Sequence, residues 1–582
     1  METPVRSSSL KDRESELEDP PRMASGGEAG ICDERMLCAA AWMLTRGGAL
    51  VELSEAEASL VRDARDTPTS GTLETWRTQI RAGGDPLGNA LMRLRSAERR
   101  RGLGATYTPE ALVQPMSEWL AGFGNPGRVV DPGAGSGRFL CAVGPLLPES
   151  ELVAVELDPL AALITRANLT VLGLDMRSRL HVCDYRSLRL SSVSFPTAFI
   201  GNPPYVRHHS IPPEWKDWLR RSAADLGLKV SALAGMHVHF LLATAHLARV
   251  GDFGVFVTSS EWLDVAYGQL ARELVAGPLG GLSIHILNTR VPAFSGVMTT
   301  AAVTTFEVGQ QQHPVRVCKV DSAGELRGLR GGAPFGRAQL RSTRRWSSLL
   351  EPRVAVPREF VPLGELCRVH RGTATGANAV WVTGQGDPRL PDSVLRPAVT
   401  KASELFSLGS AVLDDSGALR AVIDLPADLD TIDEKCRALV ERFLEAARRD
   451  GVADSYTARH RNPWWAIKLR DPAPILSTYM ARRPPTFVRN SAEVRNLNAV
   501  HGIYPVDPMS DAALHRLARS LRDRASLLGG RTYSGGLTKF EPKEMEKIMV
   551  PPPSWLESGE SLASLGLSEE ATGRRAATRG GC

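Results

Sequence analysis

Between about residue 105 and residue 310, the apolar positions of this chain follow two patterns that alternate. Short apolar runs typical of buried strands occur at 128–133, 151–158, 197–205, 251–259, 282–287 and 299–308. Segments with helical patterning separate some of them, at 160–173 and 235–251. Buried strands that alternate with covering helices build a mostly parallel sheet with helices on both faces. The sequence therefore predicts an α/β fold for residues 101–310, which we expect to form one domain.

The flanking regions have different patterns. Residues 1–30 are polar and charged, and we expect them to be disordered. Residues 31–100 carry helical patterning, as in "DERMLCAAAWMLTR". Residues 311–355 are rich in glycine and arginine and have little periodicity, which predicts a basic linker. Residues 356–552 mix strand-like and helical segments, so we expect a second compact domain of the mixed α+β class, followed by a disordered tail at 553–582.

Composition narrows the class of protein. A chain of 582 residues that is 43% hydrophobic can build two or more domains with real cores. A net charge of +5 permits a nucleic-acid partner only through a local basic face. The chain has no apolar run of membrane-spanning length and no apolar signal core at its start, so we expect a cytoplasmic protein without a membrane partner. The eight cysteines are scattered without metal-ligand spacing, and we expect no bound metal.

A glycine-rich turn, "DPGAGSG", follows the first predicted strand. Gly133, Gly135 and Gly137 allow a tight turn and the close approach of a ligand. The next strand ends at Glu156, whose carboxylate is placed to bind both hydroxyls of a ribose. The spacing is not the GxGxxG of dinucleotide-binding turns, and Asp131 beside the loop suits a cationic ligand such as the methionine part of S-adenosylmethionine. Together these residues favour nucleoside binding over a plain strand-turn-helix corner.

Two further segments follow strands of the predicted sheet. Asp184, after the third strand-like segment, can accept a hydrogen bond from an adenine amino group or can cap a helix. Asn202, Pro203, Pro204 and Tyr205 end the fourth strand. The oxygen of the Asn202 side chain and the carbonyl of Pro203 can accept both hydrogens of a planar amine and so localise its lone pair. The prolines hold these acceptors still, and Tyr205 offers a face on which a base can stack.

In their order and amino-acid sequence these motifs resemble those of the gamma-type N6-adenine DNA methyltransferases of type II restriction-modification systems. The resemblance rests on "GATYTPEALVQPM", "DPGAGSG", "VELDP", "CDY" and "GNPPYVRHH", and extends over about residues 90–552. It implies a Rossmann-like methyltransferase domain, a C-terminal target recognition domain, and methyl transfer from S-adenosylmethionine to a flipped adenine. It also implies a separately encoded restriction endonuclease as a possible partner in host protection, and a monomeric protein.

The resemblance implies roles for single residues. The cofactor would be bound by Thr106, Tyr107, Thr108, Pro109, Asp131, Pro132, Gly133, Ala134, Gly135, Gly137, Glu156, Leu157, Asp184 and Asn202. Catalysis would fall to Asn202, Pro203, Pro204 and Tyr205, and the flipped adenine would contact Tyr205 and Phe294. In the C-terminal half, Arg371, Arg461, Arg489 and Lys539 are candidates for contacts with double-stranded DNA. For any single arginine a solvated surface position is an equal alternative.

Several alternatives stay open. N4-cytosine methylation follows the same planar-amine logic, although serine in place of Asn202 is more usual there. Methyltransferases that act on RNA bases or on protein glutamine share the motif, but they lack a large C-terminal recognition domain. Cytosine C5 methylation is excluded because no cysteine follows a proline. A fused nuclease is disfavoured because the first 100 residues lack a convincing acidic pair followed by Glu-x-Lys.

Overall fold

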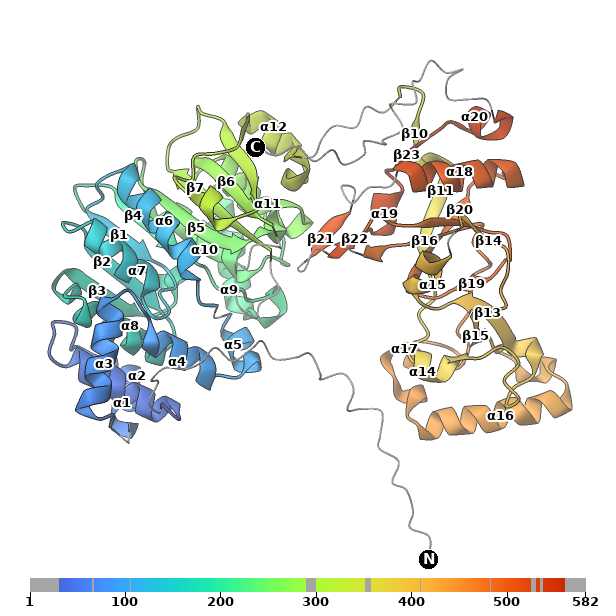
Figure 1. Ribbon diagram of the computed structural model, residues 1–582, viewed down its shortest axis with the longest axis horizontal. Coiled ribbons are helices and arrows are strands. Elements are labelled where there is room, and N and C mark those ends of the chain that lie inside the picture. The colour runs from blue at the N-terminus through green and yellow to red at the C-terminus, as the bar shows by residue number, and fades with distance from the viewer. Residues whose placement is uncertain are drawn as a thin grey trace, which may run out of the picture.

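The computed structural model describes residues 31–64, 67–104, 106–288, 300–350, 357–408, 410–481, 483–524, 530–533 and 537–559. The segment at 1–30 that was predicted to be disordered lies outside these residues, and so does most of the predicted tail. Figure 1 shows the described chain from its blue N-terminal helices, through a central sheet in cyan and green, to a C-terminal part in yellow and red.

A nine-stranded sheet forms the centre of the N-terminal half. Its strands lie in the order β3-β2-β1-β4-β5-β7-β6-β8-β9. The strands β3, β2, β1, β4 and β5 pair in parallel, whereas β7 is antiparallel to both β5 and β6. The predicted mostly parallel α/β sheet is therefore confirmed. The bounds are β1 Arg128–Asp131, β2 Glu151–Glu156, β3 Ser178–Val182, β4 Thr197–Gly201, β5 Phe253–Ser259, β6 Gly281–Leu287, β7 Ala301–Glu307, β8 Val315–Val320 and β9 Ala333–Phe335.

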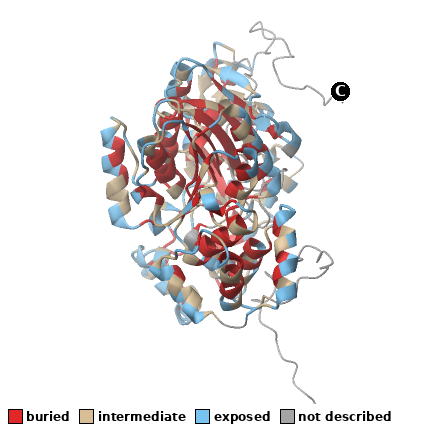
Figure 2. Cartoon of the chain, turned by 90° about the vertical axis from the view of Figure 1, so that its left-hand side faces the viewer, coloured by how far each residue is buried: buried red, intermediate tan, exposed pale blue. Residues whose placement is uncertain are grey.

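Helices cover both faces of this sheet, because successive side chains of a strand point to opposite faces. Val129 of β1 belongs to an apolar cluster with α6 and α7, whereas its neighbour Val130 belongs to a cluster with α9, α10 and α11. These helices are α6 Glu110–Phe123, α7 Arg138–Val143, α9 Pro213–Asp225, α10 Met236–Leu247 and α11 Gln269–Ala276. Figure 2 shows that buried residues concentrate in the strands and on the helix sides that face them.

The N-terminal region is helical, as its patterning predicts. Its helices are α1 Glu34–Thr45, α2 Glu55–Asp63, α3 Ser70–Arg81, α4 Pro86–Leu94 and α5 Ala97–Leu103. Apolar residues of α1, α3 and α4 pack against α8 (Pro159–Val171), which follows β2. A buried ion pair joins the same layers: Arg166 Nε lies 2.7 Å from Glu57 Oε1, and the two side chains are 6% and 0% exposed. Removing one partner of such a pair costs about 3–5 kcal/mol, because it leaves an uncompensated charge.

The predicted linker at 311–355 is wrong for much of its length. Its residues 315–320 form β8, which pairs in parallel with β6, and β9 then pairs antiparallel with β8. The apolar alternation of β8 is limited to Val315 and Val317, since Val320 is buried on the opposite face of the sheet, and the surrounding glycines and arginines obscure it. Arg337 of α12 (Arg337–Ser342) donates to the main-chain oxygens of Val275, Gly281 and Gln310. This arginine therefore fastens α12 to the sheet.

The C-terminal part has mixed helices and strands, as predicted. A five-stranded sheet has the order β11-β20-β16-β18-β14, a four-stranded sheet β12-β15-β13-β19 and a three-stranded sheet β17-β22-β21, while β10 pairs with β23. The strands are β10 Val361–Pro362, β11 Cys367–Arg371, β12 Val382–Thr383, β13 Leu395–Val399, β14 Val412–Leu413, β15 Arg420–Ile423, β16 Ile475–Thr478, β17 Met480–Ala481, β18 Phe487–Asn490, β19 Arg495–Asn496, β20 Val500–Pro505, β21 Arg531–Tyr533, β22 Leu537–Lys539 and β23 Met549–Val550. The helices are α13 Leu363–Leu366, α14 Asn378–Trp381, α15 Ala402–Ser407, α16 Glu434–Arg449, α17 Tyr456–Arg459, α18 Asp511–Arg524, α19 Pro542–Met545 and α20 Pro553–Ser558.

Two observations complete the fold. The prediction of a disordered tail from residue 553 is wrong for its first residues, because Pro553–Ser558 form α20 and Leu556 is fully buried against the C-terminal core. Within the described part of the chain, no helix combines the length and the apolar character that crossing a membrane requires.

Candidate active site

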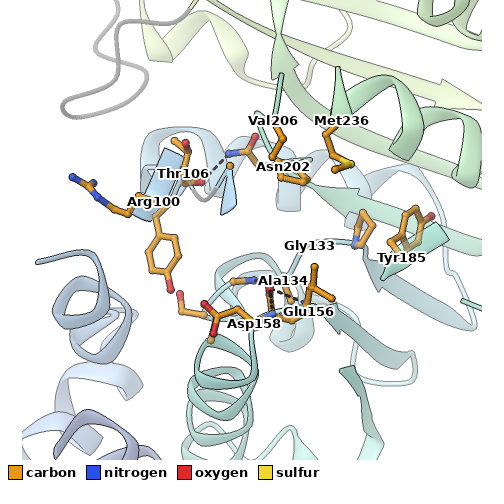
Figure 3. Close-up of a pocket in the computed structure, with 18 of the residues that line it drawn as sticks. Arg100, Thr106, Gly133, Ala134, Glu156, Asp158, Tyr185, Asn202, Val206 and Met236 are labelled. Carbon is orange, nitrogen blue, oxygen red and sulfur yellow. Dashed lines mark hydrogen bonds between the residues drawn. The ribbon is translucent and has the colours of Figure 1, made fainter. Parts of the chain in front are cut away.

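The candidate residues from four motifs meet at one edge of the central sheet. Asp131 ends β1, Glu156 ends β2, Asp184 follows β3 and Asn202 follows β4. All four strands are parallel, so their carboxyl ends share an edge, and the strand order changes direction between β1 and β4. Open α/β sheets bind ligands at such a switch point. A cavity of about 240 Å³ lies there, and Figure 3 shows its lining.

The glycine loop is held around the carboxylate of Glu156. Gly135 has a left-handed backbone (φ +58°), and its N–H donates to Glu156 Oε2 at 2.7 Å. The main-chain N–H groups of Leu157 and Asp158 donate to Oε1 at 2.8 and 2.9 Å. Burial raises the pKa of Glu156 to about 7, although these three donors oppose the shift. The loop therefore fixes the orientation of an acidic group at the cavity.

Asp131 is the most buried acid of the site. It is fully buried, and its Oδ1 accepts from the Gly133 N–H at 3.3 Å, whereas Oδ2 has no hydrogen-bond partner. Burial raises its pKa to about 8. The tight fit needs glycine at position 201, since a Cβ there would lie 2.9 Å from Asp131 Oδ1. A buried carboxyl with one unused oxygen is suited to a cationic or hydrogen-donating group nearby.

The side chain of Asn202 is fixed in one orientation. Its Nδ2 donates to the main-chain oxygen of Thr106 and to Thr108 Oγ1, both at 3.1 Å. A carbonyl oxygen can only accept, so the amide nitrogen must face Thr106. The amide oxygen, Oδ1, is buried and has no partner. Figure 3 shows Asn202 beside Thr106, with the dashed bond between them. Asn202 thus offers the cavity a fixed acceptor.

Asp184 takes the capping role that the sequence left open as an alternative. Its Oδ1 accepts from the Arg186 main-chain N–H at 2.9 Å, which caps a short 3-10 helix. The guanidinium of Arg186 also binds both carboxylate oxygens, at 2.8 and 2.6 Å. This guanidinium is itself held, because its Cζ lies 3.8 Å from the centre of the Trp215 ring and Nη1 donates to His239 Nδ1. Asp184 still lines the cavity, so its carboxylate is both clamped and accessible.

The cavity brings together most of the predicted cofactor residues. It is lined by Thr106, Tyr107, Thr108, Pro132, Gly133, Ala134, Gly135, Glu156, Leu157, Asp184, Asn202 and Pro204. Five of the predicted residues support these walls without lining the cavity, namely Pro109, Asp131, Gly137, Pro203 and Tyr205. Tyr205 is positioned by its main-chain N–H, which donates to Gly104 O at 3.1 Å. Phe294, the second residue predicted to contact the target base, lies outside the described residues.

Sequence reasoning missed several residues of the cavity. The lining also includes Met92, Arg95, Ser136, Arg138, Asp158, Tyr185, Arg186, Met236 and Phe240. Met92 and Arg95 come from α4 and the residue after it, so the N-terminal helical region reaches the site. Ser136 and Arg138 are the neighbours of Gly137 in the glycine-rich turn. Their place beside this turn could have identified them as residues of the cavity.

The four candidate DNA-binding residues have protein partners in the structure. Arg371 and Lys539 both pair with Glu541, Lys539 at 2.7 Å. Arg461 donates to the main-chain oxygens of Ala374 and Thr375.

Arg489 has both an acidic partner and main-chain partners. Its side chain is 14% exposed, pairs with Asp511 at 2.7 Å, and donates to the oxygens of Pro474 and Asn490. Arg461 and Arg489 therefore stabilise the C-terminal part directly, whereas Arg371 stays 59% exposed.

Comparison with known proteins adds a family relationship. Residues 349–568 match a family model described as "Type II methyltransferase M.Eco57I, C-terminal domain". Type II methyltransferase M.XamI of Xanthomonas campestris pv. amaranthicola is 46% identical over 511 residues, which cover 86% of this chain and 94% of that protein. Type II methyltransferase M.AccI of Acinetobacter calcoaceticus is 20% identical over 483 residues, covering 78% and 86% of the two chains.

A solved structure supports the fold. The type IIL restriction-modification enzyme MmeI, solved in complex with DNA, aligns with a TM-score of 0.52 at 14% sequence identity. The alignment covers 86% of this chain and 78% of that chain. The likeness thus extends over both the central sheet and the C-terminal part, and it concerns the fold alone.

Proposed function

Because the chain belongs to the type II methyltransferases, which methylate DNA, we propose that it transfers a methyl group from S-adenosylmethionine to the exocyclic N6 of an adenine flipped out of duplex DNA. The observation that carries this proposal is the fixed amide of Asn202, whose unpartnered oxygen is buried at the cavity. A flipped base is the natural donor to this oxygen, since an enzyme cannot reach the amino group inside a stacked duplex.

The residues of the cavity fit S-adenosylmethionine, which supplies an activated methyl group when bound. Glu156 presents a carboxylate held by three main-chain donors at the tip of β2, where it can accept from ribose hydroxyls. Asp131, behind the cavity wall, has a buried oxygen without a partner, which favours a positively charged amino-acid and sulfonium end nearby. Asp184, clamped by Arg186, can accept from the adenine amino group of the cofactor.

Asn202 and Pro203 then act on the substrate amine. An aromatic amino nitrogen is a weak nucleophile because its lone pair is delocalised into the ring. Two hydrogen bonds, to Asn202 Oδ1 and to the Pro203 carbonyl, favour a tetrahedral nitrogen with a localised lone pair. The acceptors need no reorganisation because the prolines and the bonds to Thr106 and Thr108 fix them beforehand. The nitrogen would attack the methyl carbon as the carbon–sulfur bond breaks and its electron pair returns to sulfur. S-adenosylhomocysteine would then leave, and the surplus proton of the nitrogen would pass to water.

Pro204 belongs to the same rigid turn, and we assign the face of Tyr205 to stacking on the flipped base, with Phe294 as a second contact. The C-terminal part, including Arg371 and Lys539, would supply contacts with duplex DNA. We further propose that the protein acts as a monomer in the cytoplasm. Its methylation would protect host DNA from a separately encoded restriction endonuclease.

N4-cytosine methylation is the second candidate, since Asn202 could accept equally well from a cytosine amino group. The two products can be separated directly. Duplex phage DNA without modified bases is incubated with the protein and S-adenosylmethionine, digested to nucleosides and analysed by mass spectrometry. We expect N6-methyladenine. N4-methylcytosine as the product would replace the adenine proposal, and methyl transfer only to RNA or protein would overturn the choice of DNA.

A further inference from the structure

A carboxylate of the N-terminal helical region lies behind the glycine loop. Asp85 precedes α4 and caps it, because Oδ1 accepts from the Gly88 N–H at 2.9 Å. The same side chain reaches into the central domain. Its Oδ1 accepts from Asn168 Nδ2 at 3.2 Å, and its Oδ2 accepts from Ser136 Oγ at 2.5 Å. Ser136 lies in the glycine loop and lines the cavity.

Asp85 also holds an arginine that reaches the catalytic asparagine through one further residue. Arg138 Nε donates to Asp85 Oδ2 at 2.7 Å, with the two side chains 24% and 10% exposed. Arg138 Nη1 then donates to the main-chain oxygen of Thr108 at 3.0 Å. The hydroxyl of Thr108 accepts from Asn202 Nδ2. Hydrogen bonds through Arg138, together with the covalent bonds of Thr108 between its main-chain oxygen and its hydroxyl, therefore connect Asp85 to the amide that the proposed chemistry uses.

We propose that Asp85 and Arg138 are positioning residues of the methyl-transfer site. Through Arg138 and Thr108, Asp85 fixes the orientation of the Asn202 amide, and through Ser136 it fixes the glycine loop. The N-terminal helical region then contributes a positioning residue to the active site. This inference rests on the proposed function and deepens it. Its physical basis is that an acceptor must be held before the reaction for its full effect to appear in the transition state.

Asp85 acts in two directions, toward Thr108 through Arg138 and toward the glycine loop through Ser136, and we expect different effects when each is changed. Arg138→Lys keeps the charge but cannot form the same set of hydrogen bonds. Because Arg138 contacts Thr108, this change should act mainly on the chemical step. Asp85→Asn removes the charge that holds both Arg138 and Ser136, so it should affect both the chemical step and cofactor binding. A purely structural role would instead lower stability and leave both properties of the folded protein unchanged.

A matched control exists in the same region. Glu57 also joins the N-terminal helices to the central domain through a buried pair with an arginine, Arg166, but neither residue lines the cavity. Glu57→Gln should lower the thermal unfolding midpoint without changing the turnover of the folded enzyme. If Glu57→Gln does not fold, Arg177→Lys replaces it. Arg177 donates to the main-chain oxygens of Gly144, Leu147 and Ser150, away from the cavity.

The experiment measures three quantities on the full-length protein. These are kcat for methyl transfer to unmodified phage DNA, the dissociation constant of S-adenosylhomocysteine by calorimetry, and the thermal unfolding midpoint. We expect Arg138→Lys to lower kcat about tenfold with the dissociation constant within threefold of wild type. Asp85→Asn should lower kcat about tenfold and raise the dissociation constant at least fivefold.

A double-variant cycle tests the route through Thr108. Thr108→Val removes the acceptor for Asn202, so combining it with Arg138→Lys should cost little more than the stronger single change. If the losses of kcat in the two single variants multiply in the double variant, the inference is overturned. Variants that change only the unfolding midpoint would also overturn it. If the wild-type protein transfers no methyl group to DNA, the proposed function fails instead. The effect of Asp85→Asn on binding of S-adenosylhomocysteine would still test the role of Asp85 in fixing the glycine loop through Ser136.

Discussion

The side-chain nitrogen of Asn202 lies 3.1 Å from the hydroxyl oxygen of Thr108. A second bond of equal length to the Thr106 carbonyl uses the other amide hydrogen, so the nitrogen is satisfied and the oxygen is left over. The threonines before the glycine loop are thus connected to the motif after β4. The family resemblance had assigned them to the cofactor, whereas the geometry gives them a second task, the orientation of an acceptor.

Thr108→Val should lower kcat by about fivefold to tenfold, because it removes one hydrogen bond worth about 1 kcal/mol from the nitrogen of Asn202. Thr108→Ser keeps the hydroxyl and should restore most of the activity. Steady-state kinetics at saturating cofactor give both values. Equal activity of the valine and serine variants would show that the hydroxyl does not orient the amide.

The ligand-free protein should lose stability as the pH rises from about 4 to about 8. The folded-state pKa of Asp131 is raised to about 8 and that of Glu156 to about 7, both by burial. The folded state therefore keeps protons that the unfolded chain releases near pH 4. The stability that these protons provide is lost as the pH rises through the two folded-state pKa values. Asp131→Asn should reduce this decline, as measured by thermal unfolding between pH 5 and pH 9. A steeper decline in the variant would contradict the assignment.

Arg371→Ala should weaken binding to duplex DNA and reduce the slope of log K against log salt by about 1, the effect expected for one lost phosphate contact. Its side chain is 59% exposed and pairs with Glu541, so the unfolding midpoint should hardly change. Fluorescence anisotropy with labelled duplex DNA at several salt concentrations measures the slope. An unchanged slope would remove Arg371 from the DNA-binding surface.

Arg489→Ala should act on stability instead. It would leave the oxygens of Pro474 and Asn490 and the carboxylate of Asp511 without their donor, at a cost of about 2 kcal/mol. Urea unfolding measures the loss. The salt slope of DNA binding should match wild type, and a reduced slope with full stability would instead support Arg489 as a DNA contact.

These residues show which parts of the site a sequence can reveal. Glu156 and Asn202 were predictable because each stands in a local motif at the end of a strand, and the strands of a parallel sheet end together. Asp85 was not, since its partners Ser136 and Arg138 are 51 and 53 positions away and only packing of α4 brings them near. The protein partners of Arg489 were not predictable for a related reason. An arginine in a basic region looks available until the fold places acceptors around it.

The same limit applies to the fold. The short apolar runs predicted β1, β2, β4, β5, β6 and β7, whose residues are mostly buried. In β8 only Val315 and Val317 alternate, Val320 is buried on the opposite face, and the glycine-rich and arginine-rich sequence around them suggested a linker. The pairing of β8 with β6 supplies the hydrogen bonds that decide the conformation, and this pairing is not visible in the local sequence.

The orientation of the Asn202 amide can be tested by comparing Asn202→Ala and Asn202→Asp with wild type in single-turnover methyl transfer to DNA, alongside calorimetric binding of S-adenosylhomocysteine. The aspartate keeps the size of the side chain but cannot donate to the Thr106 carbonyl. Both variants should lose at least about 100-fold in rate while binding the cofactor product within threefold of wild type. A variant that keeps more than a tenth of the wild-type rate would contradict the claim that this oxygen accepts from the substrate amine.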